Sequence, residues 1–277
     1  MVQEINMVQE INSNQNKVFK QIRSLLNKKY RQKWDQFIIE GERFVDYAVT
    51  HHYAIAYICI RQDLMDHFVS VEKLHLYQEV AKVIVLPQNL FSELTDTEHS
   101  QGVIGVLALP KPVALETLFS EEVLPQVVFL DRLQDPGNVG TIIRTADACG
   151  IEYIVLSKGT VDPYNNKVVR STAGSILNVK LIEIEDAQMC LNLLKDHGYT
   201  LLVTALEAAF VYNDQKAYGA FNCLVIGNEA NGVSDQIMSL DSHKITIPIY
   251  GKAESLNASV AAGIMMYKIN EYCIQNK

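Results

Sequence analysis

The sequence predicts a two-domain α/β protein whose C-terminal half contains a parallel β-sheet covered by helices. Its 277 residues, 48% of them hydrophobic, are enough for two compact domains. Pro110-Lys111-Pro112 and the acidic stretch after it indicate a linker, because closely spaced prolines stiffen the chain and cannot donate ladder hydrogen bonds. Beyond this linker lie short, wholly apolar runs, which are typical of strands buried on both faces of a parallel sheet. These runs are 127–130, 153–156, 201–203 and 223–226.

The N-terminal half alternates strand and helix patterns. It begins with the hexapeptide MVQEIN written twice, which is too short for a structural repeat, so residues 1–16 are expected to be a disordered lead-in. A basic helix is expected from Lys17 on. The elements expected after it are a strand at 37–39, a helix opened by Gly41, a β-rich stretch at 53–60, a strand at 83–86, a helix around 90–94 and a strand at 102–109. We therefore expect a first domain at 17–110 and a linker at 111–124.

The C-terminal half, 125–277, adds helices between its apolar runs. Their apolar spacing places them at 139–148, 164–175 and 187–196. A last helix, at about 257–274, is apolar around most of its circumference and must be buried on more than one side. It is either a core helix or a helix shared between the core and a subunit interface.

Charge is distributed unevenly along the chain. A net charge of −8 speaks against a nucleic-acid partner, because affinity for phosphates comes largely from Lys and Arg. The stretch up to Trp34 nevertheless holds a run of basic residues with no acidic residue among them, namely Lys17, Lys20, Arg23, Lys28, Lys29, Arg31 and Lys33. This local positive patch fits a phosphate-binding surface and, equally, a solvated helix face.

Several classes of protein lose support. No run of 18 or more apolar residues and no signal peptide is present, so we expect a cytoplasmic protein without a membrane span. The 5 cysteines are scattered and form no CxxC pair, which argues against a disulfide framework and against a metal site. The chain also lacks GxGxxG, GxxxxGK[ST], HExxH and GxSxG, the best signatures of dinucleotide dehydrogenases, P-loop NTPases and common hydrolases.

Three loops of the C-terminal half follow expected strands, at the edge where open α/β sheets bind ligands. The first, 131–140, makes a turn at Pro136-Gly137 and leads into a helix. Asn138 is a natural cap for that helix, and Arg144 follows on it. Capping alone would explain Asn138, and a surface ion pair would explain Arg144.

The other two loops are richer in unusual residues. The second, 226–234, places two glycines around an Asn-Glu pair, so Glu229 is able to accept a proton from a ligand amine or hydroxyl. The third, 247–259, precedes the last helix, which Ser255 or Asn257 would cap. Capping explains Ser255 but not a loop of this length.

These loops together carry a specific resemblance. The order N-x-x-x-x-x-R, G-N-E-x-x-G and I-P-I-x-G-x-x-E-S-L-N-x-S resembles the three motifs of the SpoU (TrmH) methyltransferases. The N-terminal half is similar to the ribosomal-protein-like substrate-binding domain of many members, through 37–41 and 100–103. The resemblance implies a trefoil-knotted parallel sheet, a homodimer, S-adenosylmethionine as cofactor, and methylation of a ribose 2′-hydroxyl in a structured RNA.

The resemblance also assigns residues by their place in the motifs. The residues implied at the reacting centre are Asn138, Arg144, Glu229 and Asn257. Those implied to hold the cofactor are Thr204, Ala205, Gly227, Ile247, Ser255 and Leu256. Those expected to contact RNA phosphates are Lys28, Lys29, Arg31, Lys33 and Arg170.

A mechanism follows as a hypothesis. A ribose hydroxyl is a poor nucleophile at neutral pH, so attack on the sulfonium methyl needs positioning and a polarised hydroxyl proton. We expect Arg144 to contact the 2′-hydroxyl and its phosphate, while Asn138 and Asn257 orient the ribose. Glu229 would anchor the site. A guanidinium is effectively never deprotonated in proteins, so Arg144 is expected to be essential without being the base.

Other functions stay open. The ribosomal-protein-like domain favours large-subunit ribosomal RNA over transfer RNA as substrate. A non-catalytic RNA-binding or ribosome-assembly protein on the same fold is a further alternative, against which the intact motifs argue. A nucleotide-binding oxidoreductase is disfavoured by the missing glycine fingerprint.

Overall fold

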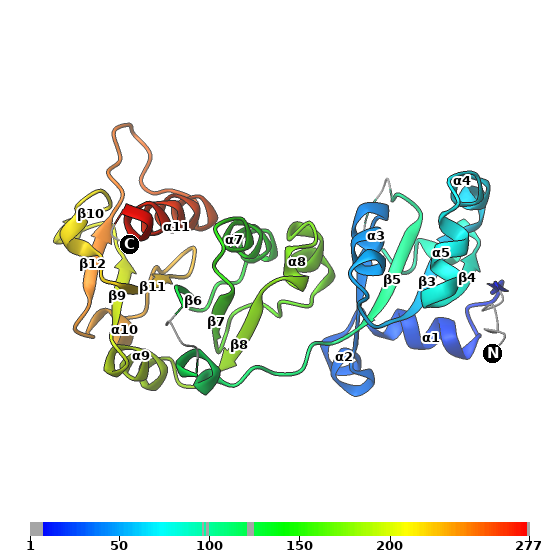
Figure 1. Cartoon of the computed structure of the whole chain (residues 1–277), viewed down its shortest axis with the longest axis horizontal. Helices are drawn as coiled ribbons and strands as arrows, with labels where there is room; N and C mark the ends of the chain where they lie inside the picture. The colour runs from blue at the N-terminus through cyan, green and yellow to red at the C-terminus, as the bar shows by residue number, and fades with distance from the viewer. Residues whose placement is uncertain (1–7, 96, 98–99, 121–124, 276–277) are drawn as a thin grey trace. The chain divides into compact units, whose positions relative to one another are not determined.

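The computed structural model describes residues 8–95, 97, 100–120 and 125–275 (Figure 1). The chain divides into two compact units. The first consists of the residues up to Pro110 together with Tyr164–Arg170, and the second of Lys111–Pro163 together with the residues from Ser171 on.

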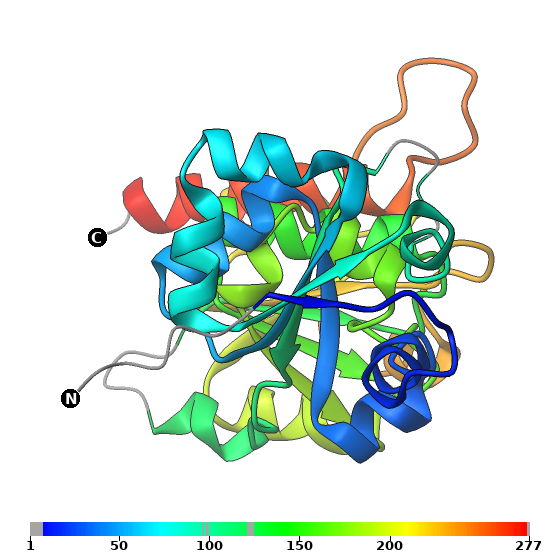
Figure 2. The same cartoon turned by 90° about the vertical axis from the view of Figure 1, so that its right-hand side faces the viewer.

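The first unit is built on a five-stranded mixed sheet (Figure 2). Its strands, in spatial order, are β1 (Gln9–Glu10), β4 (Lys82–Leu86), β3 (Ile55–Arg61), β5 (Val103–Ala108) and β2 (Gln36–Glu40). β4 is parallel to β1 and β3, whereas β5 is antiparallel to β3 and β2. The strands predicted from the apolar runs of this half are therefore confirmed.

Helices cover both faces of this sheet. The helices are α1 (Lys17–Ser24), α2 (Lys28–Trp34), α3 (Glu42–Thr50), α4 (Met65–Ser70), α5 (Lys73–Val80) and α6 (Gln88–Phe91). On one face, Phe19 and Ile22 of α1 and Phe91 of α6 share a buried cluster with strand residues. On the other, α3 packs against β2 and β5, and α5 packs against β4. Gly41 precedes α3 with φ +105°, a conformation that L side chains rarely adopt, which accounts for glycine at that helix start.

The lead-in differs from the expectation. β1 pairs with β4, the Ile11 N–H donates to the Val85 carbonyl at 3.0 Å, and the Ile11 side chain is buried. The expectation of disorder is thus wrong for residues 9–16, while residues 1–7 lie outside the described part of the chain. A two-residue strand with one buried isoleucine is too short for hydrophobic periodicity to reveal.

The basic stretch forms two helices where one was expected. α1 ends at Ser24, α2 begins at Lys28, and each is capped by an asparagine. The Asn16 side chain accepts from the Val18 N–H at 2.8 Å, and the Asn27 side chain accepts from the Lys29 N–H at 2.9 Å. The break therefore has a capping signal that a count of charges does not detect.

The second unit contains a seven-stranded sheet whose pairings are all parallel among the described residues. Its strands, in spatial order, are β10 (Phe210–Val211), β12 (His243–Thr246), β9 (Tyr199–Thr204), β11 (Phe221–Ile226), β6 (Val127–Leu130), β7 (Tyr153–Ser157) and β8 (Lys180–Ile184). The predicted parallel sheet is confirmed. β8, β10 and β12 were not expected; β8 and β10 end the sheet, and β8 and β12 mix charged with apolar residues.

Helices cover both faces of this sheet as well (Figure 1). The helices are α7 (Pro136–Ala148), α9 (Ala187–Asp196), α10 (Asp235–Met238) and α11 (Ala258–Gln275). A further helix, α8 (Asn166–Ser171), belongs to the first unit except for its last residue. Leu191 of α9 and Ile237 of α10 share a buried cluster with alternate strand residues such as Phe129 and Val225. α11 packs against α7 and β11 on the opposite face. Among the described residues, no helix has the combined length and apolar character needed to cross a membrane.

Candidate active site

The three loops singled out in the sequence begin where β6, β11 and β12 end. β6 and β11 are direct neighbours, and β12 is separated from β11 by β9. The carboxyl ends of parallel strands lie at one edge of a sheet, so the loops meet there. The loop between β12 and α11 is the longest of the three and projects away from the sheet in both views (Figures 1 and 2).

One hydrogen-bonded chain of side chains joins the three loops. The Asn257 Nδ2 donates to the Asn138 Oδ1 at 2.9 Å, and the Asn138 Nδ2 donates to the Glu229 Oε1 at 3.1 Å. Glu229 also accepts from the backbone N–H groups of Gln134 at 3.2 Å and Asp135 at 3.1 Å. Three of the four residues expected at the reacting centre, one from each loop, are thus in direct contact.

The neighbouring groups determine the direction of these hydrogen bonds. The Asn257 Oδ1 accepts from the Ser259 N–H at 2.9 Å and the Ser259 hydroxyl at 2.7 Å, which leaves its amide nitrogen facing Asn138. An amide has one accepting and one donating end, so Asn138 must in turn donate toward Glu229. Glu229 therefore acts as an acceptor, as an ionised carboxylate does. Each amide nitrogen keeps a second N–H for another partner.

The pKa of Glu229 agrees with this arrangement. Partial burial raises the pKa of this carboxyl, but hydrogen bonds from Asn138 and from backbone N–H groups outweigh burial, so the net pKa lies below its ordinary value. Glu229 is consequently ionised at neutral pH.

Capping does not explain Asn138. The Asp135 side chain caps α7, accepting from the Asn138 N–H at 2.7 Å, and Pro136 occupies the first turn. The expectation that Asn138 is the cap is therefore wrong. Asn138 lies in the first turn of the helix and is only 7% exposed, and its side-chain amide forms the hydrogen bonds between the loops. Asn257, by contrast, does cap α11 while it contacts Asn138.

Arg144 is not part of this contact. It is exposed on α7, and its side chain makes no hydrogen bond or ion pair with any residue that the structure describes. Six residues along a helix correspond to a displacement of about 9 Å and a rotation of about 120° from Asn138. Within one chain, Arg144 therefore stands apart from the Asn138 amide.

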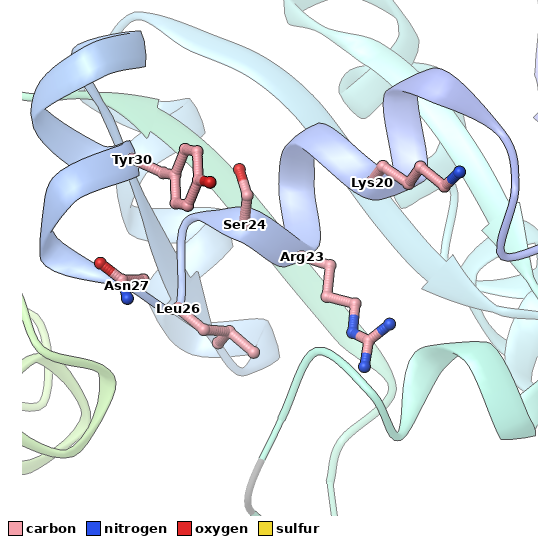
Figure 3. Close-up of a pocket in the computed structure, with 6 residues that line it drawn as sticks. All are labelled: Lys20, Arg23, Ser24, Leu26, Asn27 and Tyr30. Carbon is pink, nitrogen blue, oxygen red and sulfur yellow. The ribbon is translucent and has the colours of Figure 1, made fainter.

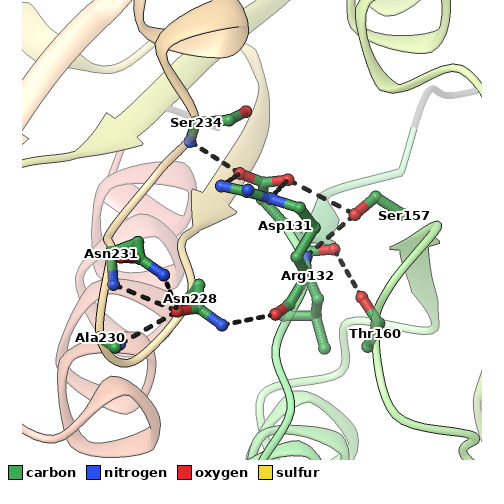
Figure 4. Close-up of polar contacts among 9 residues, drawn as sticks. Asp131, Arg132, Ser157, Thr160, Asn228, Ala230, Asn231 and Ser234 are labelled. Carbon is green, nitrogen blue, oxygen red and sulfur yellow. Dashed lines mark hydrogen bonds and ion pairs between the residues drawn. The ribbon is translucent and has the colours of Figure 1, made fainter.

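A second polar cluster fixes the loop that carries Glu229 (Figure 4). The buried Asp131 carboxylate, 2% exposed, accepts from the Ser234 N–H at 2.8 Å. The Asn228 Nδ2 donates to the Arg132 carbonyl at 2.8 Å, and its Oδ1 accepts from the next turn of the loop. Asp131 was not among the residues expected at the site, although a carboxylate directly after a wholly apolar strand was a usable signal.

Gly227 is required by this loop. A Cβ atom placed on it would lie 2.2 Å from the Val233 backbone nitrogen and 2.7 Å from the Gly232 carbonyl oxygen. No side chain fits at that approach. The close approach of this backbone explains why a glycine follows β11, independently of the cofactor role expected for Gly227.

The other residues expected to hold the cofactor lie at the same edge of the sheet. The Thr204 hydroxyl donates to the Val225 carbonyl at 3.0 Å, and the Ala205 N–H donates to the Ile245 carbonyl at 3.0 Å. The projecting loop contains the rest, namely Ile247, Ser255 and Leu256. Among the described residues, no three His, Cys, Asp or Glu side chains gather to hold a metal ion.

The residues expected to contact RNA differ in their surroundings. Lys28, Lys29 and Lys33 are exposed on α2. Arg31 is 3% exposed, and its Nη1 donates to the Leu25 carbonyl at 2.6 Å, so it supports the turn between α1 and α2 instead of reaching solvent. Arg170 is half-buried; its Nη1 donates to the Thr97 hydroxyl at 2.8 Å and lies 3.7 Å from a carboxylate oxygen of Glu40.

Comparison with known families and proteins finds similar proteins over both units of the chain. Residues 125–267 match the SpoU rRNA Methylase family, and residues 16–105 match the MRM3-like substrate binding domain. The 23S rRNA (guanosine(2553)-2′-O)-methyltransferase RlmP of Bacillus subtilis is 32% identical over 95% of this chain and 99% of its own length.

Two solved structures resemble the whole chain. The AdoMet-bound rRNA methyltransferase from Sinorhizobium meliloti has 28% sequence identity and a TM-score of 0.82, over 96% of this chain and 98% of its own. The SpoU methyltransferase AviRb from Streptomyces viridochromogenes, in complex with AdoMet, has 26% identity and a TM-score of 0.81, over 94% and 98%.

Proposed function

The chain belongs to the SpoU rRNA Methylase family and is an S-adenosylmethionine-dependent RNA 2′-O-methyltransferase, and we propose that its substrate is ribosomal RNA of the large subunit. The observation that carries the proposal is the hydrogen-bonded chain from Glu229 through Asn138 to Asn257, which joins the three motif loops. The name of the Bacillus subtilis relative, a 23S rRNA methyltransferase, supports the choice of RNA. Other relatives are described as tRNA/rRNA methyltransferases, so transfer RNA is the alternative.

S-adenosylmethionine fits the loops at the ends of β9, β11 and β12. None of the backbone N–H groups of residues 249–256 donates to another described residue, so a long stretch of main chain is available to a ligand. We propose that this loop, with Thr204, Ala205 and Gly227 on the neighbouring loops, holds the adenosine. The bound cofactor supplies an already activated methyl group.

The chain's own side chains then position the RNA. Asn138 and Asn257 each keep one amide N–H beyond the bonds described above, and these donors suit the oxygens of a ribose or phosphate. Arg144 offers an exposed guanidinium for the 2′-hydroxyl and its phosphate. Glu229 holds the two loops together and stays ionised.

We propose a homodimer formed through α11. One side of this helix is buried through residues such as Met265 and Ile269, whereas Val260, Tyr267 and Ile274 are 51%, 59% and 73% exposed. These three residues recur every seventh position, so they form one apolar stripe along the helix. A stripe of this kind on the last helix suits a second copy of the chain. Light scattering of wild type and of Tyr267→Asp tests it, with a dimer expected for the first and a monomer for the second.

The path of the C-terminus supports a trefoil knot. β12 lies beyond β9, yet α11 after it returns to pack on β11 and α7, so the projecting loop must cross the strand ends. We propose that this crossing threads the chain through the preceding loops. A cytoplasmic location stays a prediction.

The test of function is tritium transfer from labelled S-adenosylmethionine to unmodified RNA, separated into ribosomal and transfer pools. Label at an alkali-resistant linkage in ribosomal RNA is the expected result, with Asn138→Ala as the inactive control. Label in transfer RNA alone would move the proposal to the alternative substrate. Failure to bind the cofactor at all would support a non-catalytic RNA-binding role.

A further inference from the structure

The first unit carries an open groove between α1 and α2 that the proposed reaction does not use (Figure 3). It has a volume of about 430 Å³, within the range of small-ligand sites. Its lining residues are Lys20, Arg23, Ser24, Leu26, Asn27 and Tyr30. The Tyr30 ring extends from α2 toward Ser24 of α1, while Lys20 and Arg23 lie farther along α1.

The walls of this groove are held in place before any ligand arrives. The Asn27 Oδ1 caps α2, and the buried Arg31 side chain donates to the Leu25 carbonyl in the turn between α1 and α2. Leu25 itself is fully buried. Preorganised walls lower the ordering cost of binding.

Exposed aromatic and aliphatic groups distinguish this surface from a solvated helix face. Leu26, Tyr30 and Trp34 are 39%, 37% and 41% exposed. Tyr30 and Trp34, four residues apart, lie on one side of α2, and Leu26 lies in the turn before this helix. The Lys33 ammonium lies 5.0 Å from the Trp34 ring centroid. A surface that only contacted duplex phosphates would need the cations but not the rings.

Charge identifies the occupant. The segment from Lys17 to Trp34 has six exposed basic residues besides the buried Arg31 and no acidic one, in a chain of net charge −8. Aromatic rings among cations are the surface with which proteins bind unpaired nucleotides, since each base offers a face for stacking and each phosphate a charge.

We propose that this groove binds an unpaired nucleotide of the RNA substrate, distinct from the nucleotide that is methylated. Tyr30 stacks on the base beside Leu26, and Lys20 and Arg23 contact its flanking phosphates. Arg23 is paired with Glu93 at 3.0 Å in the free protein, so a phosphate takes the place of that carboxylate.

Base recognition is available at the same place. The Asn27 Nδ2 has no hydrogen-bond partner among the described residues, and the Ser24 hydroxyl donates to the Gln21 carbonyl while its oxygen can still accept. The inference rests on RNA being the substrate. The groove belongs to the first unit, whereas Asn138, Glu229 and Asn257 belong to the second, so the two can be tested separately.

The test measures binding of the full-length protein to a labelled ten-nucleotide oligo(A) and to a blunt RNA duplex over a range of salt. Tyr30→Ala is expected to weaken oligo(A) binding about five- to hundredfold, which is the range for loss of one stacked base. Duplex binding and the salt slope should not change. Tyr30→Phe should bind as wild type, and Lys20→Ala should reduce the salt slope by about 0.7.

Leu76→Ala is the matched control, because Leu76 is a 51% exposed apolar residue of the same unit on α5. It should bind both RNAs as wild type. Ribosomal RNA methylation by Tyr30→Ala should show a raised KM with kcat unchanged.

The outcomes separate the groove from the reaction. If Tyr30→Ala binds oligo(A) as wild type does while the wild-type enzyme methylates ribosomal RNA, the groove inference is overturned and the proposed function stands. If oligo(A) binding depends on Tyr30 but no RNA is methylated, the groove stands and the proposed function fails.

Discussion

Replacing Asn138 by aspartate turns an attractive contact with Glu229 into a repulsive one, with almost no change in the shape of the side chain. The carboxylate can still accept from Asn257, but an oxygen replaces the nitrogen that donates to Glu229 at 3.1 Å. Two unit charges 3.1 Å apart repel by about 5 kcal/mol at an effective dielectric constant of about 20. Because Glu229 lies toward solvent, we discount this by half and expect Asn138→Asp to lose about 2 to 3 kcal/mol of stability at neutral pH.

The sign of the pH dependence distinguishes this cause from simple loss of a hydrogen bond. In the wild-type chain the pKa of Glu229 is lowered, so its contribution to stability is present at neutral pH and is lost as the pH falls through the folded-state pKa. In Asn138→Asp the paired carboxylates raise the pKa of one of them, so the variant regains stability as the pH falls below neutral. The Tm deficit relative to wild type should therefore shrink between about pH 8 and about pH 5.

Thermal melts of wild type, Asn138→Asp and Asn138→Ala over this pH range provide the measurement. Asn138→Ala, which only loses hydrogen bonds, should show a deficit that varies little with pH. Asn178→Asp is the matched control, because the Asn178 Nδ2 also donates to a carboxylate, that of Asp147, at 3.0 Å but in an exposed setting. A deficit in Asn138→Asp that is constant with pH, or no larger than that of Asn178→Asp, would refute the reasoning.

Three further changes test separate parts of the site. Arg144→Ala should lower kcat by about a hundredfold or more with cofactor affinity retained, because the exposed side chain forms no hydrogen bond or ion pair with a described residue. Calorimetric titration with S-adenosylmethionine and the methylation assay measure the two effects, and near-normal turnover would remove Arg144 from the mechanism. Gly227→Ala should cost about 1 to 3 kcal/mol and weaken cofactor binding, because its Cβ would meet the Val233 nitrogen at 2.2 Å; an unchanged urea midpoint would contradict this. The double change of Lys28 and Lys29 to alanine should reduce the salt slope of duplex RNA binding by about 1 to 2, and an unchanged slope would make this face of α2 a solvated surface only.

The strands of the parallel sheet could be predicted from the sequence more completely than the ends of the helices. Buried strands such as β6 and β11 are apolar throughout, so composition alone reveals them, whereas β8 and β12 mix charged with apolar residues and escape notice. The cap of α7 shows a second limit. Asp135 and Asn138 are both good caps, and only the hydrogen bonds decide that Asp135 caps the helix and leaves the Asn138 amide for the site.

Charge counts were the least informative signal. Arg31 belongs to the same basic run as Lys28 and Lys29, yet it is buried and supports the α1–α2 turn. Long-range contacts decide such cases, and a local pattern cannot show them. Asp131 shows that a single charged residue outside the basic run is structurally important. Its buried carboxylate binds the backbone of a loop about a hundred residues away in sequence.

The role of Glu229 follows from the number of its bonds. Its Oε1 accepts from Asn138 and from the Asp135 N–H, and its Oε2 accepts from the Gln134 N–H, so three donors already surround the carboxylate. A general base needs a pKa near the working pH and a free lone pair directed at the substrate proton. The pKa of Glu229 is lowered, and three donors from the first motif loop already bind its carboxylate. These properties suit a residue that holds the loops together better than they suit a general base. We therefore propose that Glu229 acts on the reaction through Asn138, to which it is hydrogen-bonded, and that the amide groups rather than the carboxylate contact the ribose.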